Sequence, residues 1–253
     1  MTSFLNHQAI PALCIPITGR TKATIHEQLK LLLKEQADMI EWRADFFEQL
    51  ADVEEVLEVI RAIKSQTDLP LLFTIRAAHE GGEAITLTEA EKVTLLEHVC
   101  FDSQVNAVDY ELSNRAQNVA RVQQAAQTNG KKYIASFHDF KQTPSAETMI
   151  KKGEAAEQAG ADIVKFAVMP QVKADVFRLL DATELLNNRL SIPVVTMSMG
   201  ELGAISRVIG WTFGSVITFG TAAAASAPGQ PPAGKLKKAI KEVQAIAPIW
   251  QEL

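Results

Sequence analysis

Short apolar segments alternate with longer amphipathic segments along the whole chain. The short segments predict strands, because each is a brief run of mostly apolar and β-branched residues between turn-forming residues. They are Ala12–Ile17, Met39–Ala44, Leu71–Arg76, Ala107–Leu112, Tyr133–Phe137, Ile163–Ala167, Pro193–Met197 and Val216–Phe219.

The longer segments have the spacing of apolar residues that is typical of helices. In the second of them, Val53, Val56, Leu57, Ile60 and Ile63 make one apolar stripe, and Asp52 can cap the first turn. Before a later one, Thr143 is the expected cap, with Pro144 at the first helical position. The predicted helices are Ile25–Gln36, Val53–Lys64, Glu89–Phe101, Arg115–Thr128, Ala146–Ala159 and Val172–Asn187.

Regular alternation of strands and helices predicts parallel strands covered by helices, which is the α/β class. About eight such units in 253 residues favour a closed (β/α)8 TIM barrel over an open sheet. No Pro-rich or Ser-rich linker interrupts the chain, so we expect a single domain over residues 1–253. Residues 1–11 precede the first strand and are expected to be an added N-terminal segment.

The formal net charge of −5, without a block of like charge, disfavours nucleic acid and anionic membranes as partners. No apolar stretch approaches the roughly 20 residues that span a bilayer, and the N-terminus lacks the pattern of a signal peptide. A cytoplasmic protein is therefore expected. Cys14 and Cys100 are expected to be buried free thiols, which cannot form a structural zinc site alone.

Polar residues occupy one face of several predicted strands. Side chains alternate between the two faces of a strand, and the opposite-face residues Trp42, Val164 and Phe166 suit packing under helices. The polar face is therefore the barrel interior, near the C-terminal mouth where active sites of this architecture lie. The polar residues on this face are Glu41, Arg43, Thr74, Arg76, Asp109, Glu111, Ser136, His138 and Lys165.

Lys165 is the candidate nucleophile of this cluster. Burial penalises its ammonium form and lowers the lysine pKa, and a nearby Arg43 or Arg76 would act in the same direction. The resulting neutral amine can attack a ketone to form a Schiff base. The alternative is a structural lysine, neutralised by Glu41 or Glu111.

His138 is the candidate general acid and base. Its ordinary pKa near 6.5 suits a group that takes up a proton and returns it, and Glu41 could hold its ring. The alternative is a hydrogen-bonded core histidine. We expect no metal site, because His138 and Asp139 are neighbours in a strand and point to opposite faces.

Arg207, Ser226 and Gln230 lie near the last two strands, and the arginine fork suits a planar carboxylate. The sequence holds no phosphate-binding loop with Lys and Ser/Thr and no dinucleotide fingerprint. The loop that contains Pro228 to Pro232 could act as a lid over a substrate.

Taken together, these segments resemble type I 3-dehydroquinate dehydratase over nearly the whole chain. The resemblance is carried by Glu41-Trp42-Arg43-Ala44-Asp45, Phe73-Thr74-Ile75-Arg76 with Glu80-Gly81-Gly82-Glu83, Ser136-Phe137-His138-Asp139-Phe140, Ala161-Asp162-Ile163-Val164-Lys165-Phe166-Ala167, Ser198-Met199-Gly200 with Ser206-Arg207, and Ser226-Ala227-Pro228-Gly229-Gln230.

The resemblance implies a homodimeric barrel that converts 3-dehydroquinate to 3-dehydroshikimate and water, in the shikimate route to aromatic amino acids, without metal or organic cofactor. It implies that Lys165 forms the Schiff base, that His138 shuttles protons and that Glu41 positions it. The residues that it assigns to substrate binding are Arg43, Arg76, Arg207, Ser226 and Gln230. Two alternatives stay open at this point: a class I Schiff-base aldolase acting on a small keto acid, and a non-catalytic barrel that only binds a ligand.

Overall fold

The computed structural model describes residues 11–223 and 225–246. The expected N-terminal segment lies, apart from Pro11, outside the described residues. None of the helices in the described ranges is long and apolar enough to cross a membrane.

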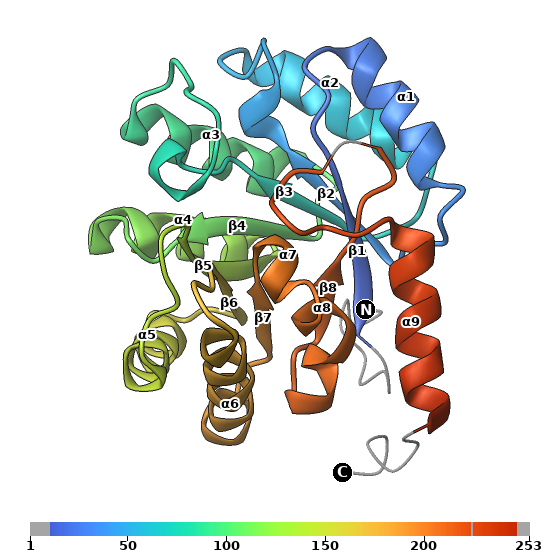
Figure 1. The fold of residues 1–253 in the computed structure, drawn as a ribbon. Helices are drawn as coiled ribbons and strands as arrows, with labels where there is room; N and C mark the ends of the chain where they lie inside the picture. The colour runs from blue at the N-terminus through green and yellow to red at the C-terminus, as the bar shows by residue number, and fades with distance from the viewer. Residues whose placement is uncertain (1–10, 224, 247–253) are drawn as a thin grey trace.

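Within the described residues, eight parallel strands form one sheet in the order β7-β6-β5-β4-β3-β2-β1-β8 (Figure 1). The two edge strands meet where the Val216 backbone N–H donates to the Val194 carbonyl oxygen at 2.9 Å. This closes the (β/α)8 barrel that the sequence predicts. The strands are β1 (Ala12–Ile17), β2 (Met39–Arg43), β3 (Leu71–Thr74), β4 (Ala107–Glu111), β5 (Lys132–Asp139), β6 (Ile163–Val168), β7 (Val194–Ser198) and β8 (Ile217–Phe219).

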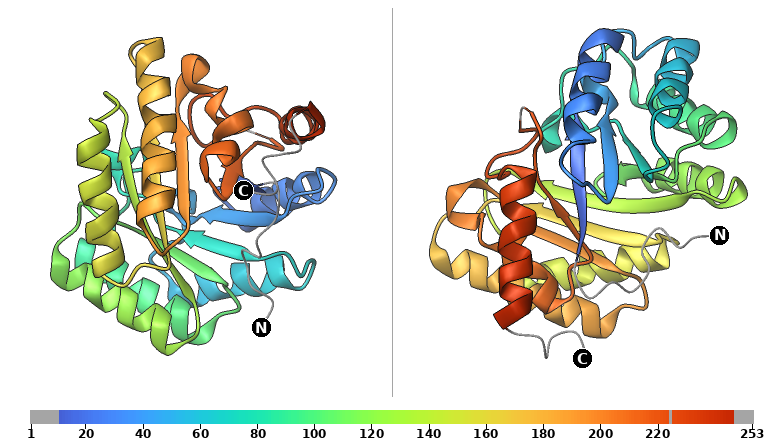
Figure 2. Two further views of the ribbon diagram at one scale, coloured as in Figure 1. Left: turned by 90° about the horizontal axis from the view of Figure 1, so that it is seen from below. Right: turned by 90° about the vertical axis from the view of Figure 1, so that its right-hand side faces the viewer.

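Helices cover the outer face of the sheet (Figure 2). The six predicted helices are present with small shifts at their ends, as α1 (Lys22–Leu32), α2 (Val53–Lys64), α3 (Glu89–Asp102), α4 (Ala116–Thr128), α5 (Ala146–Gln158) and α6 (Lys173–Arg189). The elements that the apolar pattern did not indicate are η1 (Ala44–Phe46), η2 (Ala78–Glu80), α7 (Gly200–Gly203), α8 (Ser206–Ile209), η3 (Gly210–Phe213) and α9 (Ala233–Ile246).

Two helix caps were predicted from the sequence, with different outcomes. The Asp52 carboxylate accepts the backbone N–H groups of Glu54 and Glu55, which confirms it as the cap of α2. The predicted cap Thr143 is wrong, because α5 begins two residues later. Ser145 caps α5 by accepting the Thr148 backbone N–H at 3.2 Å, a reach that only the residue directly before the first helical turn has.

Successive side chains of each strand point to opposite faces of the sheet, and this produces two separate apolar layers. Trp42, Phe73, Val164 and Phe166 belong to the layer between strands and helices. Inside the barrel, the residues near the N-terminal ends of the strands form a second apolar layer that includes Cys14, Met39, Leu72, Ile134, Ile163, Val195 and Ile217. Both cysteines are buried free thiols, as predicted. The apolar interior layer is the floor on which the polar cluster lies.

Candidate active site

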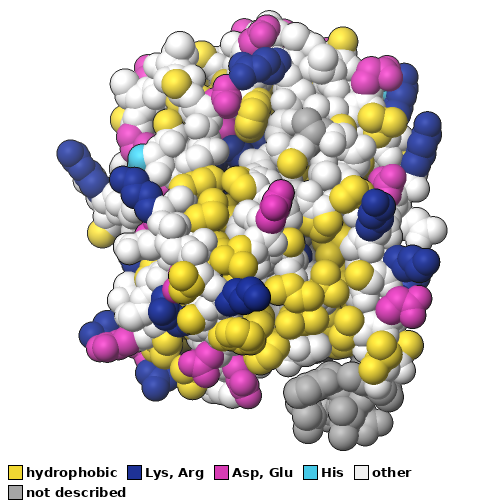
Figure 3. All heavy atoms as spheres, in the orientation of Figure 1, with side chains coloured by type: hydrophobic (Ala, Val, Ile, Leu, Met, Phe, Trp, Pro, Cys, Tyr) yellow, Lys and Arg dark blue, Asp and Glu magenta, His cyan; other side chains and the backbone are white. Residues whose placement is uncertain are grey.

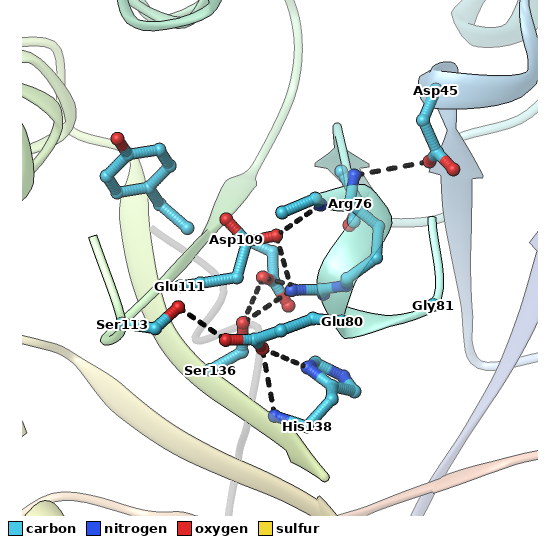
Figure 4. A network of polar contacts seen from close by, with 12 residues as sticks. Asp45, Arg76, Glu80, Gly81, Asp109, Glu111, Ser113, Ser136 and His138 are labelled. Atoms are coloured by element: carbon cyan, nitrogen blue, oxygen red, sulfur yellow. Dashed lines mark hydrogen bonds and ion pairs between the residues drawn. The ribbon is translucent and has the colours of Figure 1, made fainter. Parts of the chain in front are cut away.

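The predicted polar cluster converges in the barrel interior above this floor. Glu41, Arg43, Arg76, Asp109, Glu111, Ser136 and Lys165 are all buried, on strands that are neighbours in the sheet or, for Arg76, just beyond one. The strand register places Ser136 beside both Glu111 and Lys165. Figure 4 shows how the side chains around Arg76 point toward one another.

Lys165 lies between two carboxylates. Its Nζ is 3.2 Å from Oδ2 of Asp109 and 3.5 Å from Oε1 of Glu41. On another side, Nζ lies 4.6 Å from the centre of the Phe219 ring. From the sequence, Arg43 or Arg76 was expected to act on Lys165, and pairing with Glu41 or Glu111 was the alternative. The direct charged contacts come from acidic residues across the barrel interior, Glu41 on β2 and Asp109 on β4.

Arg76 is held by two buried carboxylates. Its Nη2 lies 2.8 Å from Asp109, and its Nη1 lies 3.0 Å from Glu111 and donates to Ser136 at 2.7 Å. Burial alone would raise the pKa of Asp109, but Arg76 and Lys165 outweigh it and lower that pKa to about 2. Asp109 therefore stays negatively charged across the neutral range.

His138 is oriented by Glu80 of η2, and this corrects the prediction that Glu41 holds its ring. Oε2 of Glu80 accepts the His138 backbone N–H at 2.9 Å and lies 3.0 Å from Nδ1 (Figure 4). We assign the Nδ1 proton to the hydrogen bond with this carboxylate, which leaves the lone pair on Nε2. Glu41 instead accepts the Thr74 hydroxyl at 3.0 Å and contacts Lys165.

The His138 imidazole is neutral near pH 7. Burial, together with the positive charges of Arg76, Lys165 and Arg43, holds the pKa of His138 well below its ordinary value. A neutral imidazole with a free Nε2 can accept a proton from a bound molecule.

A tight turn brings Glu80 to His138. Gly81 ends η2 with φ of 85°, a left-handed conformation that favours glycine, and a Cβ there would overlap the Phe140 ring. Ser113 then donates to the other Glu80 oxygen at 2.5 Å. The motif Glu80-Gly81-Gly82 was noticed in the sequence, but the role of Glu80 could not be assigned without this turn.

Arg43 is braced by Asp45 and reaches toward the loop after β8. Its Nε and Nη2 each donate to Asp45 at 2.8 Å, in the bidentate geometry that fixes a guanidinium. Its Nη1 lies 3.5 Å from the Ser226 carbonyl oxygen. In the same loop, Ser226 and Gln230 hold each other, because the Gln230 side-chain amide accepts the Ser226 backbone N–H at 2.8 Å and donates to its hydroxyl at 3.0 Å.

Arg207 is a buried cation that forms no ion pair with any residue that the structure describes. It donates to the carbonyl oxygens of Pro228 at 3.2 Å and Phe219 at 3.5 Å, but no described residue accepts a hydrogen bond from its Nε or pairs with it as a carboxylate. Burial lowers the pKa of Arg207 to about 10, so the group stays charged at neutral pH. An uncompensated buried guanidinium is a ready receptor for an anion.

All eight predicted site residues line one central hollow, with a volume of about 420 Å³ including its open mouth. They are Glu41, Arg43, Arg76, His138, Lys165, Arg207, Ser226 and Gln230. Glu80 and the apolar wall also line the hollow and were not predicted from the sequence; the wall consists of Phe140, Ala167, Met197, Met199 and Phe219. Within residues 11–223 and 225–246, no group of three or more His, Cys, Asp or Glu side chains could hold a metal ion.

Comparison with known proteins gives one consistent family. The profile of the family described as type I 3-dehydroquinase matches residues 13–247. The chain is 42% identical to the 3-dehydroquinate dehydratase of Albidiferax ferrireducens over 243 residues, covering 93% of this chain and 92% of that protein. The crystal structure of the 3-dehydroquinate dehydratase from Geobacillus kaustophilus superposes with a TM-score of 0.91 at 39% identity, covering 93% of this chain and 91% of that one. A type I enzyme structure from Clostridium difficile, with covalent modified comenic acid, gives a TM-score of 0.90 at 37% identity and 94% coverage of both chains.

Proposed function

Because the chain belongs to the type I 3-dehydroquinase family and is a hydro-lyase of the shikimate pathway that dehydrates 3-dehydroquinate, we propose that it does so through a Schiff base on Lys165. The curated relatives are dehydratases, which favours this reaction over the aldolase alternative. Location in the cytoplasm and the absence of nucleic-acid binding stay predictions from the sequence.

One observation carries the covalent route: a buried amine, a neutral imidazole and a guanidinium that pairs with no described carboxylate surround the same hollow. A hydroxylated ring with a ketone and a carboxylate needs these three groups to be bound and dehydrated through an imine. Lys165 supplies the nucleophile for the ketone, His138 the proton acceptor, and Arg207 the counter-charge for the carboxylate.

The elimination then follows from electron demand. The protonated imine withdraws electrons, so a C–H bond on the adjacent carbon becomes acidic enough for Nε2 of His138 to take the proton. The resulting enamine expels the hydroxyl group one carbon further on, and the protonated His138 donates the proton that makes it water. Hydrolysis of the imine returns the Lys165 amine and releases 3-dehydroshikimate.

Two carboxylates support these steps from different positions. Glu80 is the positioning residue for His138, since it fixes the imidazole through Nδ1 and stabilises its cation when the proton arrives. Glu41 acts next to Lys165, where it can exchange a proton with the amine at 3.5 Å.

The remaining polar residues of the hollow are suited to the substrate hydroxyl groups. Arg43, Ser226 and Gln230 lie together because Arg43 reaches the backbone of the loop that carries the other two. The Arg76 guanidinium is already paired with Asp109 and Glu111. We therefore expect Arg76 to act mainly by keeping these two carboxylates negatively charged.

Arg207→Ala is expected to lower kcat/KM by roughly 30-fold to several thousand-fold, mainly through KM, because a buried charge pair with the substrate carboxylate is worth about 2–5 kcal/mol. Steady-state kinetics with 3-dehydroquinate measures this. Arg121→Ala, which removes an arginine paired with Glu97 outside the hollow, is the matched control. An unchanged KM in Arg207→Ala would place the carboxylate elsewhere.

The outer face beside α6 to α8 suits a second copy of the chain. Val172 and Phe177 at α6, with Leu202 and Ile205 at α7 and α8, are large apolar side chains exposed by 38–70%. Apolar side chains gather over these elements in Figure 3. Monomeric proteins rarely expose a continuous apolar patch of this kind. A two-fold axis through the patch would bury the patch of one copy against the same patch of the other. We therefore assign the homodimer interface to this α6–α8 face.

Phe177→Asp is expected to convert the dimer into a monomer. The interface would otherwise bury two unpaired carboxylates, one from each copy. Sedimentation velocity at micromolar concentration measures the molar mass. Phe101→Asp is the matched control, since Phe101 is 74% exposed on α3, away from this face. A Phe177→Asp protein that stays dimeric would show that the copies meet through another surface.

The covalent route is tested by reduction with borohydride in the presence of 3-dehydroquinate, followed by peptide mass spectrometry. We expect an adduct of substrate or product mass on the peptide that contains Lys165. Turnover without any adduct would require a non-covalent elimination, and an adduct on another lysine would move the nucleophile.

A further inference from the structure

Three groups from three different strands surround the Lys165 amine. They are Asp109 of β4 at 3.2 Å, Glu41 of β2 at 3.5 Å and the Phe219 ring of β8 at 4.6 Å. Of these three groups, only Glu41 takes part in the proposed mechanism, as a proton donor and acceptor for the amine. Asp109 and Phe219 contact the reacting nitrogen directly and have no role so far.

The two carboxylates differ in how firmly they are held. Asp109 pairs with Arg76 at 2.8 Å, accepts the Ser136 hydroxyl at 2.6 Å and has a side chain with no exposed surface. Glu41 accepts one hydroxyl, from Thr74, and within the described chain its ion pair is with Lys165 alone. Asp109 is thus a fixed anion, whereas Glu41 is free to gain a proton or to turn to another donor.

Charge balance shows what imine formation changes at this nitrogen. The ammonium of Lys165 and the substrate ketone give an iminium and one water. A C=N double bond forms, the C=O double bond of the ketone breaks, and both hydrogens of the water come from the nitrogen. The positive charge is kept, but three N–H donors become one. After this step, only one of the two carboxylates can accept a hydrogen bond from the nitrogen.

We propose that Asp109 keeps this single N–H and that the face of the Phe219 ring lies against the cationic C=N group, so that together they hold the Schiff base in its protonated form. This rests on the proposed imine at Lys165. Glu41 loses its hydrogen bond in the same step and becomes available to the substrate. Only the protonated imine withdraws electrons strongly enough for the proton abstraction, so Asp109 and Phe219 act as catalytic residues.

Other charges also reach this nitrogen and set the background of its titration. Positive charges favour loss of the imine proton and negative charges oppose it. The titratable groups that line the hollow or lie next to it are Cys14 of β1, Glu41 and Arg43 of β2, Arg76, Glu80, Asp109 and Glu111, His138 of β5, and Arg207 of α8. Asp109 is the charged group closest to the nitrogen, and its effect should be the largest.

The test compares two reducing agents between pH 6 and pH 10 in the presence of 3-dehydroquinate. Cyanoborohydride reduces the protonated imine, whereas borohydride captures the imine in both forms. The ratio of the two adducts on the Lys165 peptide, measured by mass spectrometry, gives the pH at which half of the imine has lost its proton. Asp109→Asn keeps the shape of the side chain and removes its charge.

We expect Asp109→Asn to lower this midpoint by about 1–3 pH units, as loss of an opposite charge at this distance predicts. Glu111→Gln is the matched control, because it also removes a carboxylate from Arg76 but does not contact Lys165. Its midpoint should move by less than half as much. Phe219→Leu keeps an apolar side chain and should lower the midpoint by about 0.5 unit through loss of the cation–π contact.

An Asp109→Asn midpoint equal to that of the unsubstituted enzyme, or one that Glu111→Gln reproduces, would overturn the proposal. If Asp109→Asn does not fold, Phe219→Leu decides, and an unchanged midpoint there overturns it. Failure of the proposed function looks different, since the unsubstituted enzyme would then give no adduct with either reagent.

Discussion

Replacement of Lys165 by Met is expected to lower turnover of 3-dehydroquinate by on the order of 10⁴-fold to 10⁶-fold, as loss of one member of a cooperating catalytic set does. Met keeps most of the aliphatic stem and removes the amine, so no covalent intermediate can form. Turnover is followed by the absorbance of the conjugated enone product, and borohydride should trap no adduct.

Lys92 provides a control of the same kind for this variant. It is also a buried lysine and its Nζ lies 3.0 Å from Glu111, but it extends from α3 and does not line the hollow. Lys92→Met should lose stability, because Glu111 then keeps Arg76 but loses its second ion pair, and the variant should still form the adduct. A Lys165→Met enzyme with substantial activity would rule out the covalent mechanism.

Replacement of His138 by Ala is expected to lower kcat by about 10²-fold to 10⁴-fold, the usual contribution of a general acid and base. The defect should lie after imine formation, because Lys165 and its neighbours stay in place. Mixing enzyme with substrate and reducing with borohydride should therefore yield abundant adduct of substrate mass. His98→Ala, which removes an exposed histidine of α3, serves as the control.

The pH profile provides a second measure of His138. A base is active above its pKa, and burial together with the positive charges of Arg76, Lys165 and Arg43 holds the pKa of His138 well below 6.5. The acid limb of kcat/KM should therefore fall below pH 6.5, with activity kept above that limb and lost as the pH drops through it. An inactive His138→Ala protein that never traps substrate would instead make His138 necessary for forming the imine.

The sequence was sufficient for the barrel because its elements carry a regular pattern. The apolar runs of β1 and the stripe of α2 gave the bounds of both elements correctly. The turns α7 and α8 have four residues each, which is about one helical turn, so no apolar period could be seen. These turns nevertheless carry Arg207 into the hollow.

The contacts within the site were harder to predict than its members. Alternation shows which side chains point into a barrel, but the contacts across its interior depend on the curvature of the closed sheet. Glu41 was therefore assigned to His138, whereas it contacts Lys165. Glu80 comes from a turn that depends on the left-handed Gly81 and its packing against Phe140, which no strand or helix period reveals.

Within the described residues, the apolar floor lies beneath the polar cluster, and the hollow above it opens at the C-terminal mouth of the barrel. Cys14, Met39, Leu72, Ile163 and their neighbours fill the interior below the described part of the hollow, so we expect 3-dehydroquinate and 3-dehydroshikimate to use the same mouth. Each product molecule must leave before the next substrate can enter. We therefore expect accumulated product to compete with the substrate for the hollow and to inhibit the enzyme without a separate regulatory site.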